Sequence, residues 1–260
     1  MSRSVTVLGG AAAGGNPGQG CSGYLVEAGS TSIVIDLGAG TLPQLRLRRD
    51  PRELTAIVIS HMHLDHVLDL LALRYFLAYA PTRSTRRIPL WLPPGGRAFL
   101  DGLAQALVAD GEGAPYFDAV FAIETYKPDL PLKIESLTFS FAPTVHYAPC
   151  WAMRVTDHAS GVSLSYTADT GPSANLAALT SGCTVLIAEA SLSEPGDEPW
   201  ASRGHLTPEE AAALATAAGA KTLVLTHRWS EHEPDRLAAR AQEVTAARVI
   251  GAEPGLTIAW

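Results

Sequence analysis

Lysine is nearly absent from this sequence: only Lys127, Lys133 and Lys221 are present, and the formal net charge is −7. Proteins that hold long nucleic acids bind the phosphates with a concentrated basic surface. The acidic balance therefore argues against nucleic-acid binding as the main task. Charged residues make up 17% and hydrophobic residues 47% of the chain, a globular composition with no sign of disorder.

Cysteine is scarce as well. Cys21, Cys150 and Cys183 are odd in number, lie far apart and include no CxxC pair, so neither a disulfide framework nor a zinc knuckle is indicated. No apolar run reaches membrane-spanning length, and the first residues lack the pattern of a secretory signal. We therefore predict a cytoplasmic protein without a membrane partner, and a single domain over residues 1–260.

Strand-like and helix-like segments alternate along the chain. Residues 9–18 are rich in glycine but lack the Lys-Ser/Thr ending of a phosphate-binding loop, so we interpret them as a flexible loop. We predict strands at 3–9, 22–28, 31–37, 54–59, 89–93, 119–124, 132–145, 151–156, 163–169, 184–190, 222–227 and 255–260. We predict helices at 67–79, 97–109, 207–219 and 234–246, and a short one near 173. This alternation indicates an α/β fold with antiparallel pairing in its first half.

Three histidines and one aspartate, His61, His63, Asp65 and His66, directly follow the apolar strand predicted at 54–59. Imidazole and carboxylate groups are ligands that suit Zn, Mn and Fe. Alternate residues of an extended loop point the same way, so His61 and His63 can hold one ion while Asp65 and His66 face a second. A solvated polar loop is the alternative, but four ligand-type residues after an apolar strand favour a metal site.

One loop cannot saturate two ions, so further ligands are expected at other strand ends. His146, Asp169 and His227 each end an apolar strand, and in a layered α/β fold such ends can converge on one rim. Taken singly, either histidine could be an ordinary hydrogen-bonded residue, and Asp169 could cap the helix near 173. Taken together, they predict a site for two divalent ions, with Zn the first choice and Mn or Fe the alternatives.

With these ligand-type residues, the sequence resembles the metallo-β-lactamase superfamily. His61, His63, Asp65 and His66 match its HxHxDH loop in full, and His146, Asp169 and His227 match its later single ligands. The segment SGYLVEAG followed by IDLGAG is similar to its opening strands, so the resemblance covers nearly the whole chain. It implies a four-layer αβ/βα sandwich, in which two mixed β-sheets pack face to face with the helices outside.

The resemblance also implies how the ligands are shared. His61, His63 and His146 would hold one ion, Asp65, His66 and His227 the other, and Asp169 would bridge the two. The glycine-rich opening loop, Ser22-Gly23-Tyr24 and the Gly204–Thr207 segment GHLT are similar to the ribonuclease Z-like phosphodiesterases. That similarity makes His205 and Asp65 the catalytic pair beside the scissile phosphate. The alternative for His205 is an ordinary residue just before a helix N-cap.

One departure from that branch concerns the substrate. The transfer-RNA-processing members carry a long arm rich in glycine and lysine between the third and fourth ligands, whereas His146 and Asp169 are 23 positions apart with no lysine between them. We therefore expect a metal-dependent phosphodiesterase acting on a small molecule, with a cyclic nucleotide the first choice and RNA less favoured. The alternatives are a ribonuclease Z-like endonuclease acting on RNA 3′ ends, a lactone or thioester hydrolase, and a metal-binding module without catalysis.

The remaining candidates have weaker signals. Glu189 ends an apolar strand and could orient a ligand histidine. Arg228 could direct its guanidinium at a phosphate or form a surface salt bridge. His158 and His232 lie in polar turns and are expected to be exposed and without a role. The apolar helix at 67–79 either packs in the core or serves the interface of a homodimer.

Overall fold

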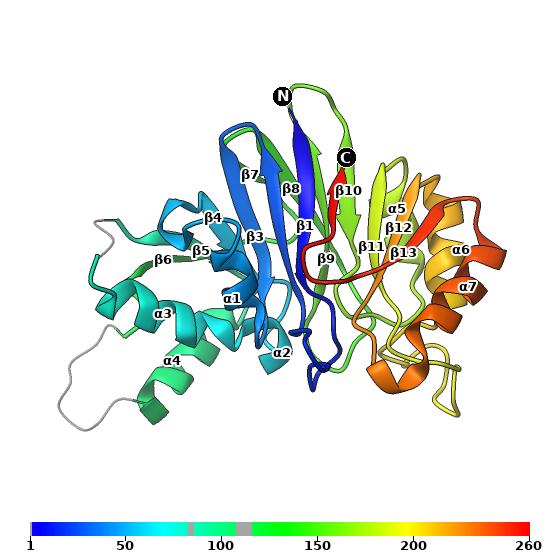
Figure 1. Cartoon of the computed structure of the whole chain (residues 1–260), viewed down its shortest axis with the longest axis horizontal. Helices are drawn as coiled ribbons and strands as arrows, with labels where there is room; N and C mark the ends of the chain where they lie inside the picture. Colours follow the sequence, from blue (N-terminus) through cyan, green and yellow to red (C-terminus); the bar gives the residue numbers. More distant parts are fainter. Residues whose placement is uncertain (1, 83–85, 108–115) are drawn as a thin grey trace.

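The strands of the protein form two mixed sheets (Figure 1). The computed structural model describes residues 2–82, 86–107 and 116–260. In the first sheet the order is β14-β1-β2-β3-β4-β5-β6, antiparallel from β14 to β3 and parallel from β3 to β6. Its strands are β1 (Arg3–Gly9), β2 (Gly23–Ala28), β3 (Thr31–Leu37), β4 (Ala56–Val58), β5 (Ile88–Leu92), β6 (Phe121–Thr125) and β14 (Thr257–Ala259).

The second sheet has the same mixed design. Its order is β13-β12-β11-β10-β9-β8-β7, antiparallel from β7 to β10 and parallel from β10 to β13. Its strands are β7 (Leu132–Ile134), β8 (Leu137–Pro143), β9 (Trp151–Asp157), β10 (Ser163–Tyr166), β11 (Val185–Glu189), β12 (Thr222–Thr226) and β13 (Arg248–Gly251). In both sheets the carboxyl ends of the parallel strands therefore lie at one edge, where the loops that follow them can meet.

Helices lie outside the two sheets, on opposite flanks of the molecule (Figure 1). On the first sheet's flank are α1 (Thr41–Arg46), α2 (Leu64–Val67), α3 (Asp69–Tyr79) and α4 (Gly96–Leu107), together with the 3-10 turn η1 (Pro51–Glu53). On the second sheet's flank are α5 (Ala174–Thr180), α6 (Pro208–Ala218), α7 (Pro234–Val244) and the 3-10 turn η2 (Ser230–His232). The helix α6 begins with a capping box formed by Thr207 and Glu210.

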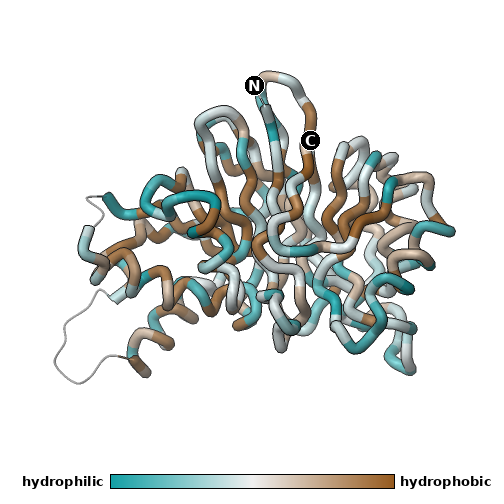
Figure 2. The backbone as a smooth tube through the Cα atoms, in the orientation of Figure 1, coloured by the Kyte–Doolittle hydropathy of each residue, from teal (hydrophilic) through white to brown (hydrophobic). Residues whose placement is uncertain are grey.

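Three hydrophobic clusters hold these layers together. One lies between the sheets and joins residues such as Val26 and Ile35 to Val155 and Ile187. A second packs the first sheet against α3 through residues such as Leu73, and a third packs the second sheet against α6. The strands of both sheets include the most hydrophobic stretches of the chain (Figure 2). The four-layer sandwich is thus confirmed.

The boundaries differ from the prediction where an element is short or a turn interrupts it. The helix predicted at 67–79 starts earlier, as α2, and is followed by α3. The strand predicted at 132–145 is two strands, because the chain turns at Glu135 with a φ of 49°. The elements α1 and β13 were not predicted, since six and four residues carry too little periodicity. The helix predicted at 97–109 is α4, and residues 108 and 109 lie outside the described ones.

The helix α3 packs in the core through Leu70, Leu73 and Leu77, as one of its two interpretations expected. Its use in a homodimer stays a prediction. Within residues 2–82, 86–107 and 116–260, no helix combines the length and the apolar character needed to cross a membrane.

Candidate metal centre

The seven predicted ligands come together from both sheets. His61, His63, Asp65 and His66 follow β4, whereas the others stand at the β8–β9 turn and after β10 and β12. The expectation of one extended loop is wrong for Asp65 and His66, which lie in the first turn of α2. His63 caps that helix with extended backbone angles, so the chain changes from loop to helix in the middle of the motif.

His61, His63, His146 and Asp169 form the first set, with their ligand atoms all within 4.8 Å of one another. His146 Nε2 lies 3.0 Å from His63 Nδ1, and Asp169 Oδ2 lies 3.8 Å from the Nε2 atoms of His61 and His146. Ligands about 2.0–2.2 Å from a tetrahedral ion are about 3.3 Å apart. The observed separations bracket that value, so one ion can be accommodated among these four side chains.

A second set, whose ligand atoms also lie within 4.8 Å of one another, consists of Asp65, His66, Asp169 and His227. His227 Nε2 lies 3.0 Å from Asp65 Oδ2, and the Nε2 atoms of His66 and His227 each lie 3.3 Å from an oxygen of Asp169. The Asp169 carboxylate belongs to both sets: Oδ1 faces His66, and Oδ2 faces His61, His146 and His227. This is the arrangement expected of a bridging ligand.

Buried polar atoms without partners supply an independent test of the fit. His61 Nε2, His66 Nε2 and Asp169 Oδ1 are all buried and form no hydrogen bond. A buried polar group left unpaired costs about 1–3 kcal/mol. All three atoms belong to the two ligand sets, so cations bound there would satisfy them together.

The pKa shifts of four ligands suit metal ions, whereas burial opposes protonation of His66 but Asp169 and Asp36 raise its pKa, so an ion bound there would displace a proton. Burial lowers the pKa of His61, and it lowers the pKa of His146 to about 4. Burial opposes ionisation of Asp65 and Asp169, but the neighbouring histidines His227 and His66 lower the pKa of both carboxyl groups. Neutral imidazole and ionised carboxylate are the forms that coordinate metal.

Asp36 at the end of β3 supports the centre from behind and was not among the predicted residues. Its buried carboxylate accepts hydrogen bonds from His66 Nδ1 at 2.8 Å, from Tyr166 Oη at 3.0 Å, and from the backbone and hydroxyl of Ser60, each at 2.7 Å. Such a partner fixes the tautomer of His66 and leaves its Nε2 lone pair for an ion. The signal was available, because a charged residue ending an apolar strand is the feature that singled out Asp169.

Backbone conformation at the strand ends is unusual. Asp36, Ala168 and His227 have φ values of 54°, 52° and 52°, in the left-handed region that side chains with a Cβ rarely adopt. Each such residue costs on the order of 1–3 kcal/mol, and such strain tends to cluster at functional sites. The surrounding structure therefore holds these three strand ends in place around the centre.

Glu189 and His205 form a pair beside the second ligand set. His205 Nδ1 lies 2.8 Å from Glu189 Oε1, and the buried Glu189 also accepts from the backbone of Thr170 at 2.7 Å. Burial opposes protonation of His205, but Glu189 raises its pKa to about 9. Ligand atoms of Glu189, His205 and His227 also lie within 4.8 Å of one another. The short His205–Glu189 contact is nevertheless a hydrogen bond, so Glu189 orients His205.

The other predicted residues lie away from this constellation. Arg228 is buried, packs against Gly251 and pairs with Glu253 at 3.3 Å, so neither a phosphate contact nor a simple surface salt bridge describes it. Ser173, not Asp169, caps α5. His158 is exposed as expected, whereas His232 is half-buried.

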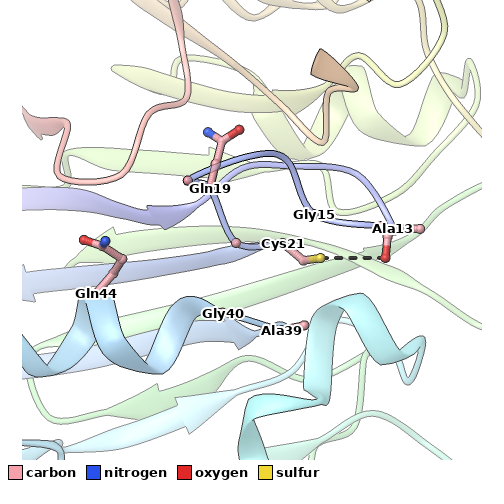
Figure 3. A pocket seen from close by; sticks show the side chains of 10 residues that line it. Ala13, Gly15, Gln19, Cys21, Ala39, Gly40 and Gln44 are labelled. Carbon is pink, nitrogen blue, oxygen red and sulfur yellow. Dashed lines mark hydrogen bonds between the residues drawn. The ribbon is translucent and has the colours of Figure 1, made fainter. Parts of the chain in front are cut away.

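The glycine-rich loop is anchored against the end of β12, where Ala12 N donates to Arg228 O and Arg228 N donates to Gly10 O. A pocket of about 410 Å³ lies between this loop and the start of α1, with Gln19, Cys21 and Gln44 along its wall (Figure 3). Close by, a Cβ on Gly38 would lie 1.8 Å from the carbonyl oxygen of Asp65. Glycine is therefore required where the chain leaves β3 beside the HMHLDH motif.

Comparison with known proteins assigns this fold to a family. A family model described as a beta-lactamase superfamily domain matches residues 25–228. The chain belongs to this superfamily. Among its relatives, Rv1339 of Mycobacterium tuberculosis is 32% identical over 243 residues, covering 90% of this chain and 84% of that protein. YhfI of Bacillus subtilis, named a probable metallo-hydrolase, is 30% identical over 253 residues, covering 96% and 97%.

A crystal structure agrees with this assignment to the superfamily. That of YhfI, a metallo-beta-lactamase fold protein, superposes with a TM-score of 0.87 and 26% identity over the whole of both chains. A ribonuclease Z from Mycobacterium sp. strain KMS is 31% identical over 251 residues, covering 85% of this chain and 83% of that protein. The chain is thus a metallo-hydrolase of the beta-lactamase superfamily, with relatives in the ribonuclease Z branch.

Proposed function

We propose that this superfamily member is a dinuclear metal-dependent phosphodiesterase that hydrolyses a small phosphodiester, with a cyclic nucleotide as the first substrate to test. The observation that carries the proposal is the hydrogen bond between His205 and Glu189 beside the two ligand sets. It gives the site a cationic donor next to a place for two ions. A phosphodiester, anionic before and during its hydrolysis, is suited to both features.

Asp65, His205 and Asp169 would have distinct tasks. Divalent ions held by the two ligand sets would act as Lewis acids and lower the pKa of water, as in other two-metal hydrolases. Asp65 belongs to the second set and would accept a hydrogen bond from the attacking water, which would orient that water. His205, kept protonated by Glu189, would donate a proton to the leaving oxygen. Asp169 would keep the two ligand sets in register.

The segment between the third and fourth ligands supports a small substrate. Residues 147–168, all of which the structure describes, form β9, β10 and their short connections, and β9 pairs with both β8 and β10. No part of this segment extends as an arm that could grip RNA. The net charge of −7 points the same way.

A second candidate is endonucleolytic processing of RNA 3′ ends. The ribonuclease Z from Mycobacterium sp., 31% identical and similar in length, favours it. Against it stands the absence of an arm in residues 147–168. Lactone or thioester hydrolysis on the same ions remains the third possibility, because such ions also polarise carbonyl groups.

The deciding experiment uses the purified protein loaded with Zn or Mn, with a chelator control. Substrates are cyclic AMP, cyclic GMP, bis(p-nitrophenyl) phosphate, a precursor transfer RNA and a lactone. We expect chelator-sensitive hydrolysis of the small phosphodiesters, reduced in His205→Ala. Cleavage of the precursor alone would establish the RNA function instead, and turnover of the lactone alone would contradict a phosphodiesterase.

A further inference from the structure

Tyr147 lies beside the two ligand sets. It directly follows His146, whose side chain is 1% exposed, yet Tyr147 itself is 60% exposed. Large aromatic side chains usually bury most of their surface unless they contact a partner. An exposed ring beside a buried site is therefore a candidate for contact with substrate.

The ring of Tyr147 has a defined place. A Cβ on Gly204 would lie 2.5–2.9 Å from three of its carbons, so the ring occupies the space that a side chain at Gly204 would fill. On the other side of this contact, Gly204 O accepts a hydrogen bond from His146 Nδ1 at 3.0 Å. Gly204 covers one part of the Tyr147 ring, and the rest of the side chain is open to solvent.

A second contact fixes the orientation of the ring. Tyr147 Oη donates a hydrogen bond to Glu198 Oε2 at 2.6 Å, from the segment that connects β11 to α6. Tyr147 is thereby held from two sides, at Gly204 and at Glu198. A ring held in this way loses little further side-chain entropy when a ligand packs on it.

The ring is also close to the groups that would act on a phosphodiester. Its centroid lies 5.3 Å from that of His146 and 5.7 Å from that of His205. A phosphoryl group between the metal ligands and His205 would place its ester substituent within reach of Tyr147. A planar substituent could then stack on the open part of the ring.

We propose that Tyr147 is a specificity-determining residue, a platform on which the aromatic part of the substrate, such as a nucleobase, stacks. This inference rests on the proposed function, since it assumes that a phosphate binds next to His205. Stacking of a base on an aromatic side chain contributes about 1–3 kcal/mol by alanine substitution. That corresponds to a loss of roughly five-fold to 150-fold in affinity.

The test measures binding, so it does not depend on turnover. Titration calorimetry on the metal-loaded protein compares adenosine monophosphate with ribose 5-phosphate, which lacks the base. We expect Tyr147→Ala to weaken adenosine monophosphate at least about five-fold and to leave ribose 5-phosphate unchanged. Tyr147→Phe keeps the ring and removes only the hydrogen bond to Glu198, so it should retain most of the preference for the base.

Trp200 supplies a matched control. It lies in the same β11–α6 connection and is 62% exposed, but it lines a separate pocket with Leu206 and Leu214. Trp200→Leu should leave both affinities unchanged. The platform is wrong if the wild type binds adenosine monophosphate no more tightly than ribose 5-phosphate, or if Tyr147→Ala weakens both ligands equally. The proposed phosphodiesterase fails on a different result, the absence of phosphodiester turnover in a protein that still binds these ligands.

Discussion

Glu189 Oε1 lies 2.8 Å from His205 Nδ1, and through this contact a carboxylate buried at the end of one strand controls a histidine on the next loop. The pair joins β11 to the segment that precedes α6. Glu189 is also held by the backbone of Thr170 and Ser191. Glu189 therefore cannot turn away from His205 without losing these backbone hydrogen bonds. Because Glu189 stays beside His205, it raises the pKa of this histidine.

In the metal-free protein, Glu189→Gln should change how stability depends on pH. The pKa of His205 is raised from 6.5 to about 9. Its contribution is thus fully present below pH 6.5 and is lost as the pH rises through about 9. The wild type should lose up to about 3 kcal/mol more than the variant between pH 6 and pH 9.5. Urea unfolding at both pH values measures this, and equal losses would contradict the pairing.

His205→Ala should lower kcat by about 10²- to 10⁴-fold, the usual contribution of a general acid. Its ring belongs to neither of the two main ligand sets, so the metal content should remain that of the wild type. Steady-state kinetics and elemental analysis of the same sample separate the two effects. Loss of metal together with activity would make His205 a ligand.

Ligand substitutions should differ in stoichiometry. His146 belongs to one set and Asp169 to both, so His146→Ala should lose one ion per chain and Asp169→Ala should lose both. Elemental analysis after dialysis measures the ratio of metal to protein. His158→Ala, which changes an exposed histidine, should bind as much metal as the wild type. Equal stoichiometry for the two ligand variants would argue against a bridging carboxylate.

Asp36→Asn should weaken both the fold and the centre. The amide keeps one acceptor oxygen, and its N–H donors face either Ser60 N, which donates to Oδ1, or Tyr166 Oη and His66 Nδ1, which bond to Oδ2. We expect a loss of about 1–3 kcal/mol in unfolding free energy and metal binding about 10- to 100-fold weaker. Denaturation of the metal-free protein and metal titration measure the two effects. Asp129→Asn, an exposed change, should alter neither.

Much of the candidate site could be predicted from local sequence. His146, Asp169 and His227 each stand where an apolar run stops, and strand ends share a rim in a layered α/β fold. The same signal was present at Asp36, but a carboxylate outside a histidine motif gives no sign of whether it binds metal or orients a ligand. Only the hydrogen bond between Asp36 and His66 Nδ1 in the folded protein shows that Asp36 orients a predicted ligand.

Other contacts have no local signal. Tyr147 and Gly204 are 57 positions apart in the sequence, and their contact depends on how the β8–β9 turn meets the β11–α6 connection. The break between extended chain and helix inside the HMHLDH motif also escaped prediction, because His63 caps α2 with its backbone conformation and not with a side-chain hydrogen bond.

The predicted ligands come from both halves of the sandwich: His61 to His66 extend from the first sheet, and His146, Asp169 and His227 extend from the second. Ions bound among them would tie two halves of the chain that are otherwise joined at this rim by packing and hydrogen bonds. They would thus act as a removable cross-link, in the way a disulfide staples distant segments of a secreted protein. Loss of the metal ions would then weaken the contact between the two sheets as well as abolish activity. The metal-free chain would therefore be the form most sensitive to proteolysis.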